Sequence, residues 1–242
     1  MVLNWPAILN LIPYIGSTST LLPLVFFLIF KRKNKEQSLK VILFYIIYCI
    51  LNEVLLLVFS YLRSKNGIFI TFASFTVFEF SFFCLFYRYA LPLTFVKNSI
   101  LTLWLMFLIF ATIDFFYINK EHDFDSLTTG IENIVIILLC IYYIAAQLKG
   151  SYSLSVYSTF DFWVIIAFLI YLSGTLFLYI MAENMLNDKK FQIQYNIINS
   201  AFNLLKNMLL SVAMLMKPTN SGAKNQLNKT DLDNLFSFQL KN

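Results

Sequence analysis

Residues 41–62 read VILFYIIYCILNEVLLLVFSYL, and this stretch decides the fold class. It contains one charged side chain, Glu53, and neither Pro nor Gly interrupts it. The hydrocarbon core of a bilayer is about 30 Å thick and needs about 20 predominantly apolar residues of helix. The stretch therefore predicts a membrane-spanning helix.

Six further apolar runs of this kind follow the same pattern, with short polar segments between them. They cover residues 8–30, 68–93, 100–117, 127–148, 162–181 and 193–216. Strands of a membrane barrel would instead alternate apolar and polar residues over about ten positions. The sequence predicts an all-α, polytopic integral membrane protein with seven transmembrane helices. Pro13, Gly16 and Pro23 predict a kinked or broken first helix, although both residue types are common in transmembrane helices.

The composition excludes most soluble classes of protein. Of the 242 residues, 59% are hydrophobic and 13% are charged, whereas soluble domains are about 45–50% apolar and about 25% charged. The chain is therefore not a soluble enzyme, a disordered protein or a secreted disulfide scaffold. Cys49, Cys84 and Cys140 all lie in apolar runs, and their odd number without a CxxC spacing argues against disulfides or a zinc site.

The distribution of Lys and Arg predicts the orientation in the membrane. Twelve of the 18 basic residues lie on the side of the loop at 31–40 and of the C-terminal residues, five lie on the opposite side, and Lys206 is inside the last span. Basic loops favour the cytoplasm, so we expect the N-terminus outside and the C-terminus in the cytoplasm of a multi-pass inner cell membrane protein. The net charge of +5 reflects this orientation signal and predicts no nucleic-acid partner.

Two regions are expected along the chain. Residues 1–216 form the seven-helix transmembrane domain, and residues 217–242 form a cytoplasmic tail. The tail begins with a polar stretch that we expect to be mostly disordered. Its end, TDLDNLFSFQL at 230–240, predicts a short amphipathic helix that docks a partner or lies on the membrane. A frayed end without a role is the alternative.

Ionisable residues at membrane depth are costly and mark functional sites by default. Five lie inside the predicted spans: Glu53, Glu79, Asp114, Glu132 and Lys206. From the helix rise, the first two and Lys206 lie roughly 15–21 Å from the cytoplasmic ends of their spans. We therefore predict that the lysine pairs with one of these two acids. Two further charges, Arg88 and Asp161, are expected to snorkel at the cytoplasmic ends of their spans.

The seventh span carries a polar stripe at helical spacing, made by Gln192, Asn196, Asn199 and Asn203. The stripe fits interhelical hydrogen bonds and equally the lining of a hydrated cavity or ligand pocket. The candidate intramembrane site, for a ligand or an ion pathway, consists of Glu53, Glu79, Lys206, Asn52, Asn199, Asn203, Asp114 and Glu132.

The sequence offers little to support catalysis. His122 is the single histidine, so no Ser-His-Asp set is available, and no phosphate-binding glycine loop occurs. We expect neither an enzyme nor a metal or cofactor site. Lys206 midway along a seventh helix is typical of a retinal Schiff base, but the paired aspartates around an Arg and the proline-kinked tryptophan pocket of such proteins are missing.

Two segments carry a resemblance to a known group. INSAFNLLKNMLLSVAML at 198–215 and FEFSFFCLFYRY at 78–89 resemble small seven-helix membrane proteins of Bacteroidota, some of which are found beside sensor histidine kinases. The resemblance covers nearly the whole chain in its span layout. It implies a membrane signalling partner, no established ligand and no catalytic residues.

We expect a receptor-like sensor that binds a ligand in the helix bundle and acts on a separate cytoplasmic protein through its loops and tail. The alternative is a proton- or cation-coupled transporter or permease subunit. Acidic residues outnumber Lys206 by four to one inside the spans, which suits a cationic substrate. A structural subunit of a larger complex is the third hypothesis.

Overall fold

A computed structural model describes residues 5–30, 37–91, 94–118, 126–149, 157–185 and 188–216. Seven helical segments in it are long and apolar enough to cross a membrane, which confirms the predicted number of spans. The first span consists of two helices, α1 (Trp5–Thr18) and α2 (Leu21–Phe30). The others are α3 (Gln37–Tyr61), α4 (Lys65–Ala90), α5 (Thr94–Ile113) with the short π-helix η1 (Asp114–Ile118), α6 (Ser126–Lys149), α7 (Phe160–Met185) and α8 (Lys189–Leu215).

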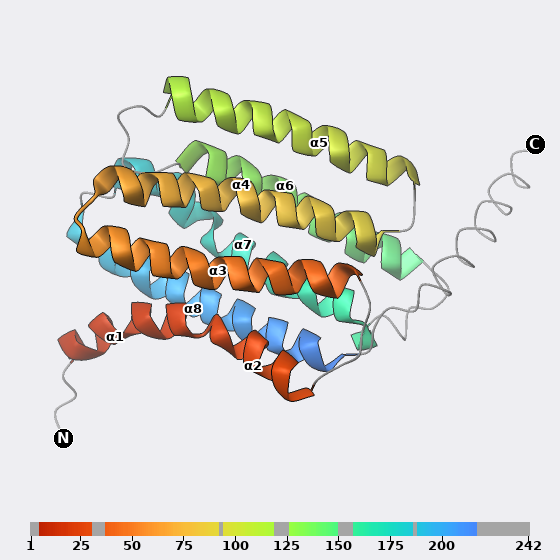
Figure 1. Ribbon diagram of the computed structural model, residues 1–242, viewed down its shortest axis with the longest axis horizontal. Helices are drawn as coiled ribbons and strands as arrows, with labels where there is room; N and C mark the ends of the chain where they lie inside the picture. Colours follow the sequence, from red (N-terminus) through yellow and green to blue (C-terminus); the bar gives the residue numbers. More distant parts are fainter. Residues whose placement is uncertain are drawn as a thin grey trace, which may run out of the picture.

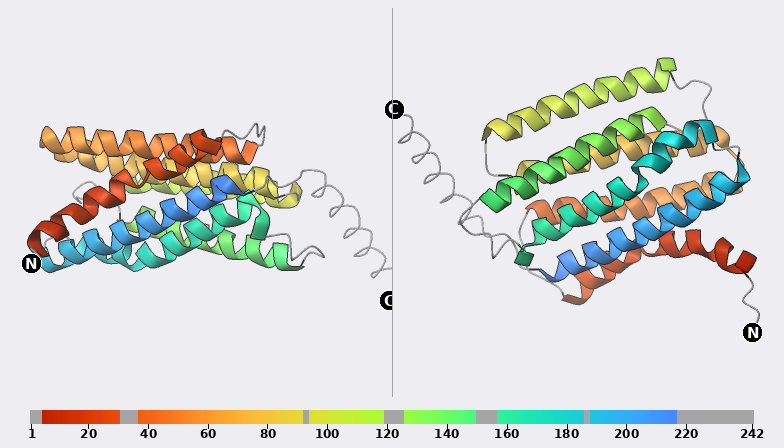
Figure 2. Two further views of the ribbon diagram at one scale, coloured as in Figure 1. Left: turned by 90° about the horizontal axis from the view of Figure 1, so that it is seen from below. Right: turned by 180° about the vertical axis from the view of Figure 1, so that it is seen from behind.

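The helices run up and down along one common direction (Figure 1). One layer holds α3 and α4 and the other holds α6, α7 and α8, while α1 and α2 cross obliquely beside α8 (Figure 2). Neighbours pack in the order α2, α3, α4, α6, α7, α8 and back to α2, so these helices form a closed ring. Helix α5 packs mainly on α4 and lies outside this ring.

The two ends of the bundle are named after the ends of α4. The Lys65 end holds the first residues of α4, α6 and α8 and lies at the left in Figure 1, and the Ala90 end holds their last residues. Local signals start two of these helices: Ser64 accepts a hydrogen bond from Gly67 N at 3.2 Å, and Asp188 accepts one from Lys190 N at 2.9 Å. Such side chains satisfy backbone donors that have no partner within the helix.

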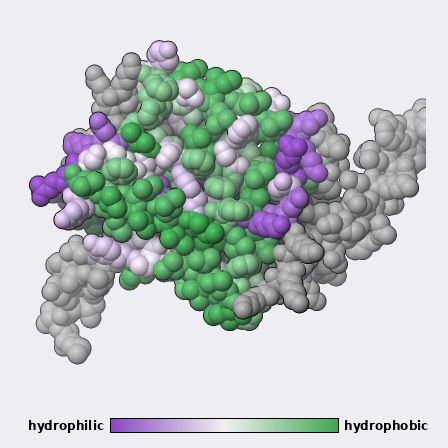
Figure 3. Space-filling model, viewed as in Figure 1, coloured by the Kyte–Doolittle hydropathy of each residue, from purple (hydrophilic) through white to green (hydrophobic). Residues whose placement is uncertain are grey.

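The outer surface between the two ends is apolar. Figure 3 shows a broad hydrophobic belt with hydrophilic residues gathered at both ends. Large apolar side chains project from it, among them Ile29 at 67% exposure, Leu57 at 63% and Phe177 at 71%. An apolar area of this size would be unfavourable in water and is what a lipid bilayer covers. The fold is therefore that of a multi-pass membrane protein.

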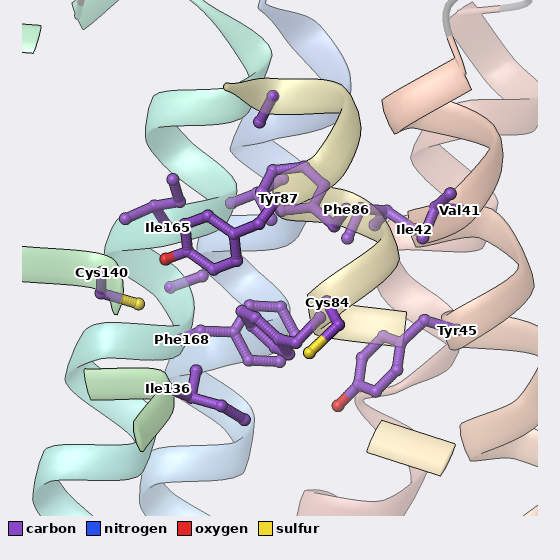
Figure 4. Close-up of a cluster of buried hydrophobic side chains, with 14 of the residues drawn as sticks. Val41, Ile42, Tyr45, Cys84, Phe86, Tyr87, Ile136, Cys140, Ile165 and Phe168 are labelled. Carbon is purple, nitrogen blue, oxygen red and sulfur yellow. The ribbon is translucent and has the colours of Figure 1, made fainter. Parts of the chain in front are cut away.

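The tightly packed core lies in the half of the bundle toward the Ala90 end. Its buried side chains come from α3, α4, α5, α6, α7 and α8, and Figure 4 shows part of this layer. Phe168 from α7 lies at its centre, with its ring centroid 4.2 Å from that of Phe83 and 5.3 Å from that of Tyr45. Edge-to-face aromatic pairs of this kind add to the stability from apolar burial.

The structure tests two details of the predicted spans, the break in the first helix and the position of Asp161. The first helix is broken, as Pro13, Gly16 and Pro23 allowed, and the break falls at Ser19 and Thr20. Asp161 was expected to snorkel, but this is wrong, because it is fully buried near the start of α7. Asp161 interacts with other groups of the bundle. The orientation stays a prediction, and the predicted tail lies outside the described residues.

Candidate functional site

A cavity of about 120 Å³ lies inside the ring of helices. All helices of the ring except α2 contribute to it, and the break in the first span adds one residue. Its lining residues are Thr20, Cys49, Asn52, Glu53, Leu56, Phe72, Phe75, Thr76, Glu79, Thr129, Glu132, Asn133, Tyr171, Tyr179, Tyr195, Asn199, Asn203 and Lys206.

Helical periodicity explains why these residues share one cavity. In α8, Tyr195, Asn199, Asn203 and Lys206 line it at spacings of four, four and three residues. Residues three and four apart lie on one helix face, and these four span about 16 Å at 1.5 Å per residue. In each lining helix the cavity residues lie toward the Lys65 end of the packed core. The polar cavity thus lies in the half of the bundle toward the Lys65 end, and the aromatic core fills the other half.

Lys206 and Glu79 are connected through a tyrosine. The Lys206 ammonium donates to the Tyr45 hydroxyl at 3.3 Å, and this hydroxyl donates to Glu79 Oε1 at 2.6 Å. All three side chains are at least 95% buried. Lys206 thus meets Glu79, one of its two predicted partners, through this bridge, because the phenol from α3 lies between the helices that carry the two charges.

The Lys206 ammonium also lies over aromatic rings. Its Nζ is 4.1 Å from the ring centroid of Tyr171, a distance at which a cation is attracted to the ring face. The Tyr171 hydroxyl lies 3.1 Å from that of Tyr179, which donates to Asn199 Oδ1 at 3.2 Å. A polar network therefore runs along the cavity wall from α7 to α8.

Helix α8 also provides hydrogen-bond partners for polar groups at the break in the first span. Asn207 donates from Nδ2 to Ser19 Oγ at 2.7 Å, and Asn203 donates from Nδ2 to the Gly16 carbonyl at 3.3 Å. Gly16 lets the two helices approach, since a Cβ there would meet Ser200 Cβ at 2.9 Å. Backbone groups that a broken helix releases in a membrane need partners from neighbouring helices. Part of the predicted polar stripe is therefore interhelical hydrogen bonding and part is cavity lining.

Helix α6 brings a buried acid and a buried amide to the cavity. Glu132 and Asn133 are each 1% exposed and both line it. The Asn133 Nδ2 atom has no hydrogen-bond partner among the described residues. On the opposite layer, Glu53 is partly buried in the lining. The cavity therefore contains three carboxyl groups and one ammonium group, and one buried amide donor without an acceptor.

Asp114 lies apart from this cavity. It is buried at the start of η1, where its Oδ2 accepts a hydrogen bond from Thr128 at 2.7 Å. The short helix η1 continues α5, which lies outside the ring. The Asp114 side chain therefore contacts the first turn of α6 and does not line the cavity. The structure thus gives Asp114 a contact between two neighbouring helices.

The structure brings seven of the eight predicted site residues to one cavity. These are Asn52, Glu53, Glu79, Glu132, Asn199, Asn203 and Lys206. Sequence reasoning missed the tyrosines and Asn133. Tyr45 could have been found, since it lies four residues before Cys49 and seven before Asn52 on one face of α3. Aromatic residues are so frequent here that composition did not single it out.

Among the described residues, no group of three or more His, Cys, Asp or Glu side chains is placed to hold a metal ion. The three cysteines are buried thiols, and Cys49 lines the cavity. Comparisons with protein-family models, with curated proteins and with solved structures find no significant match. Function must therefore be inferred from the cavity itself.

Proposed function

We propose that the protein is a membrane-embedded sensor that binds a small polar ligand in the cavity and acts on a separate protein. The observation that carries this proposal is the contrast between the two halves of the bundle. Polar side chains converge on a cavity toward the Lys65 end, and a packed aromatic core fills the half toward the Ala90 end. A concave site with a few convergent polar groups is the usual form of a ligand pocket.

The bridge from Lys206 through Tyr45 to Glu79 supports a response to the ligand. It joins α8, α3 and α4, and two of its three members line the cavity. A ligand shifts a conformational equilibrium only through different affinities for the two states. A ligand that contacts Glu79 or Lys206 competes with the bridge and so favours a different packing of these helices. The resemblance to proteins found beside sensor histidine kinases would make a kinase the receiving partner.

The second candidate function is a cation-coupled transporter, and the broken first span favours it. Thr20 at the break lines the cavity, and transporters often bind substrate where helices are discontinuous near the membrane midplane. In that function the aromatic core would open during each cycle, whereas in a sensor it stays closed to solutes.

Cys49 offers a test that separates the two functions, because it is the cysteine in the cavity lining. A Cys84→Ser/Cys140→Ser variant in proteoliposomes is treated with a small cationic methanethiosulfonate from either face. Lys65→Cys in a cysteine-free variant identifies the face nearer the cavity. A sensor is labelled at Cys49 from that face alone. Labelling from both faces, together with solute flux, would favour the transporter and contradict the sensor.

A further inference from the structure

The charges in the cavity point to a cationic ligand. Glu53, Glu79 and Glu132 face one ammonium group, that of Lys206. Lys206 is already connected to Glu79 through Tyr45, so the bridge leaves the Glu53 carboxyl group without a cation. Glu53 forms neither a hydrogen bond nor an ion pair within the described part of the chain. Charges in a low-dielectric interior are costly unless an opposite charge compensates them.

Aromatic residues in the lining also favour a cation. Phe72 and Phe75 from α4, Tyr179 from α7 and Tyr195 from α8 all line the cavity. Ring faces attract ammonium groups, most strongly where water is excluded. The protein contains its own example, since the Lys206 ammonium lies 4.1 Å from the Tyr171 ring centroid.

Asn133 provides an independent observation, because its amide would bind a hydrogen-bond acceptor of the ligand rather than a cation. It is 1% exposed, it lines the cavity, and its Nδ2 has no hydrogen-bond acceptor among the described residues. A buried donor without an acceptor is destabilising, and native proteins rarely leave one so. An acceptor atom on a bound ligand would complete this site.

The cavity volume limits the size of the ligand. About 120 Å³ is somewhat smaller than an engineered cavity of about 150 Å³ that binds benzene. A ligand that fits is therefore a few non-hydrogen atoms in size, or inserts a small cationic group of a larger molecule.

We propose that the ligand is a small organic amine that also carries a hydrogen-bond acceptor, with the cation bound near Glu53 and the acceptor bound by the Asn133 amide. This inference rests on the proposed ligand cavity and names the chemical class that the cavity recognises. It applies to a sensor and to a transporter alike, because both would bind through the same lining.

Four probes of similar size test the inference on the full-length protein in lipid nanodiscs. Ethanolamine carries a cation and a hydroxyl acceptor, ethylamine lacks the hydroxyl, ethylene glycol lacks the cation, and glycolate carries a negative charge. Binding is measured by saturation-transfer NMR and located by protection of Cys49 from the cationic methanethiosulfonate. We expect ethanolamine to bind more tightly than ethylamine, and the other two to bind at least about tenfold more weakly, which is about 1.4 kcal/mol.

Two variants assign the contacts. Glu53→Gln is expected to weaken ethanolamine binding about tenfold or more, while Asp114→Asn removes a buried carboxyl group outside the cavity and leaves binding unchanged. Asn133→Ala is expected to abolish the preference for ethanolamine over ethylamine. If a variant fails to fold, the order of the four probes on the unmodified protein still decides the matter.

Each contrary result has a distinct meaning. Stronger binding of glycolate or ethylene glycol, with protection of Cys49, would overturn the amine assignment and leave the ligand cavity in place. Equal binding of ethanolamine and ethylamine would overturn the role of Asn133. Binding of no probe would overturn the inference, whereas labelling of Cys49 from one face would still support the proposed cavity.

Discussion

Replacement of Tyr45 by Phe tests the bridge between the buried charges. The substitution removes one hydroxyl group and with it two hydrogen bonds, to Glu79 at 2.6 Å and from Lys206 at 3.3 Å. The aromatic ring remains, so its edge-to-face contact with Phe168 is preserved. The change therefore isolates the polar bridge from the packing around it.

The expected loss of stability follows from the two bond lengths. Interhelical hydrogen bonds in membrane proteins contribute about 0.6 kcal/mol on average and at most about 1.7. The short hydrogen bond to Glu79 is buried and has a carboxyl acceptor, so we assign it an energy near the upper value. The longer bond from Lys206 is assigned the average value. Tyr45→Phe should then lower the free energy of unfolding by about 2 kcal/mol.

Reversible unfolding by SDS in mixed micelles, followed by circular dichroism, measures this loss. Tyr142→Phe is the matched control, since Tyr142 is 42% exposed and should change stability by less than about 0.5 kcal/mol. A double-mutant cycle with Glu79→Ala, which removes the acceptor of the Tyr45 hydroxyl, should show a coupling of about 1–2 kcal/mol. A Tyr45→Phe protein as stable as the control, or strictly additive effects in the cycle, would refute the bridge.

Two further predictions concern the contact between α8 and the first span. Gly16→Ala should lower the free energy of unfolding by about 1–3 kcal/mol, because the new Cβ would lie 2.9 Å from Ser200 Cβ and overpack the interface. The control is Gly130→Ala, whose Cβ would lie 3.5 Å from Ile180 and which should be neutral or slightly stabilising in the same assay. Asn207→Ala should cost about 1–2 kcal/mol by leaving the helix break without its amide, and an equal effect of Asn196→Ala, at an exposed position of α8, would contradict this explanation.

Much of the candidate site was predictable, because charged and amide side chains stand out in apolar helices. Glu53, Glu79 and Lys206 were assigned similar depths from the helix rise alone, and they share one cavity. Asp114 was included in the candidate site and lies outside the cavity. The sequence does not tell which helix lies inside the ring, and α5, which the helical turn of Asp114 continues, lies outside it.

The sequence by itself determined the membrane class, the number of spans and most polar members of the cavity. These follow from local properties, since about 20 apolar residues must form a helix in lipid whatever surrounds them. The tertiary structure decided the rest: that Tyr45 separates Lys206 from Glu79, that α8 completes the break in the first span, and that Asn133 faces the cavity. These depend on how each helix is rotated about its own axis, which packing against its neighbours sets and hydropathy does not.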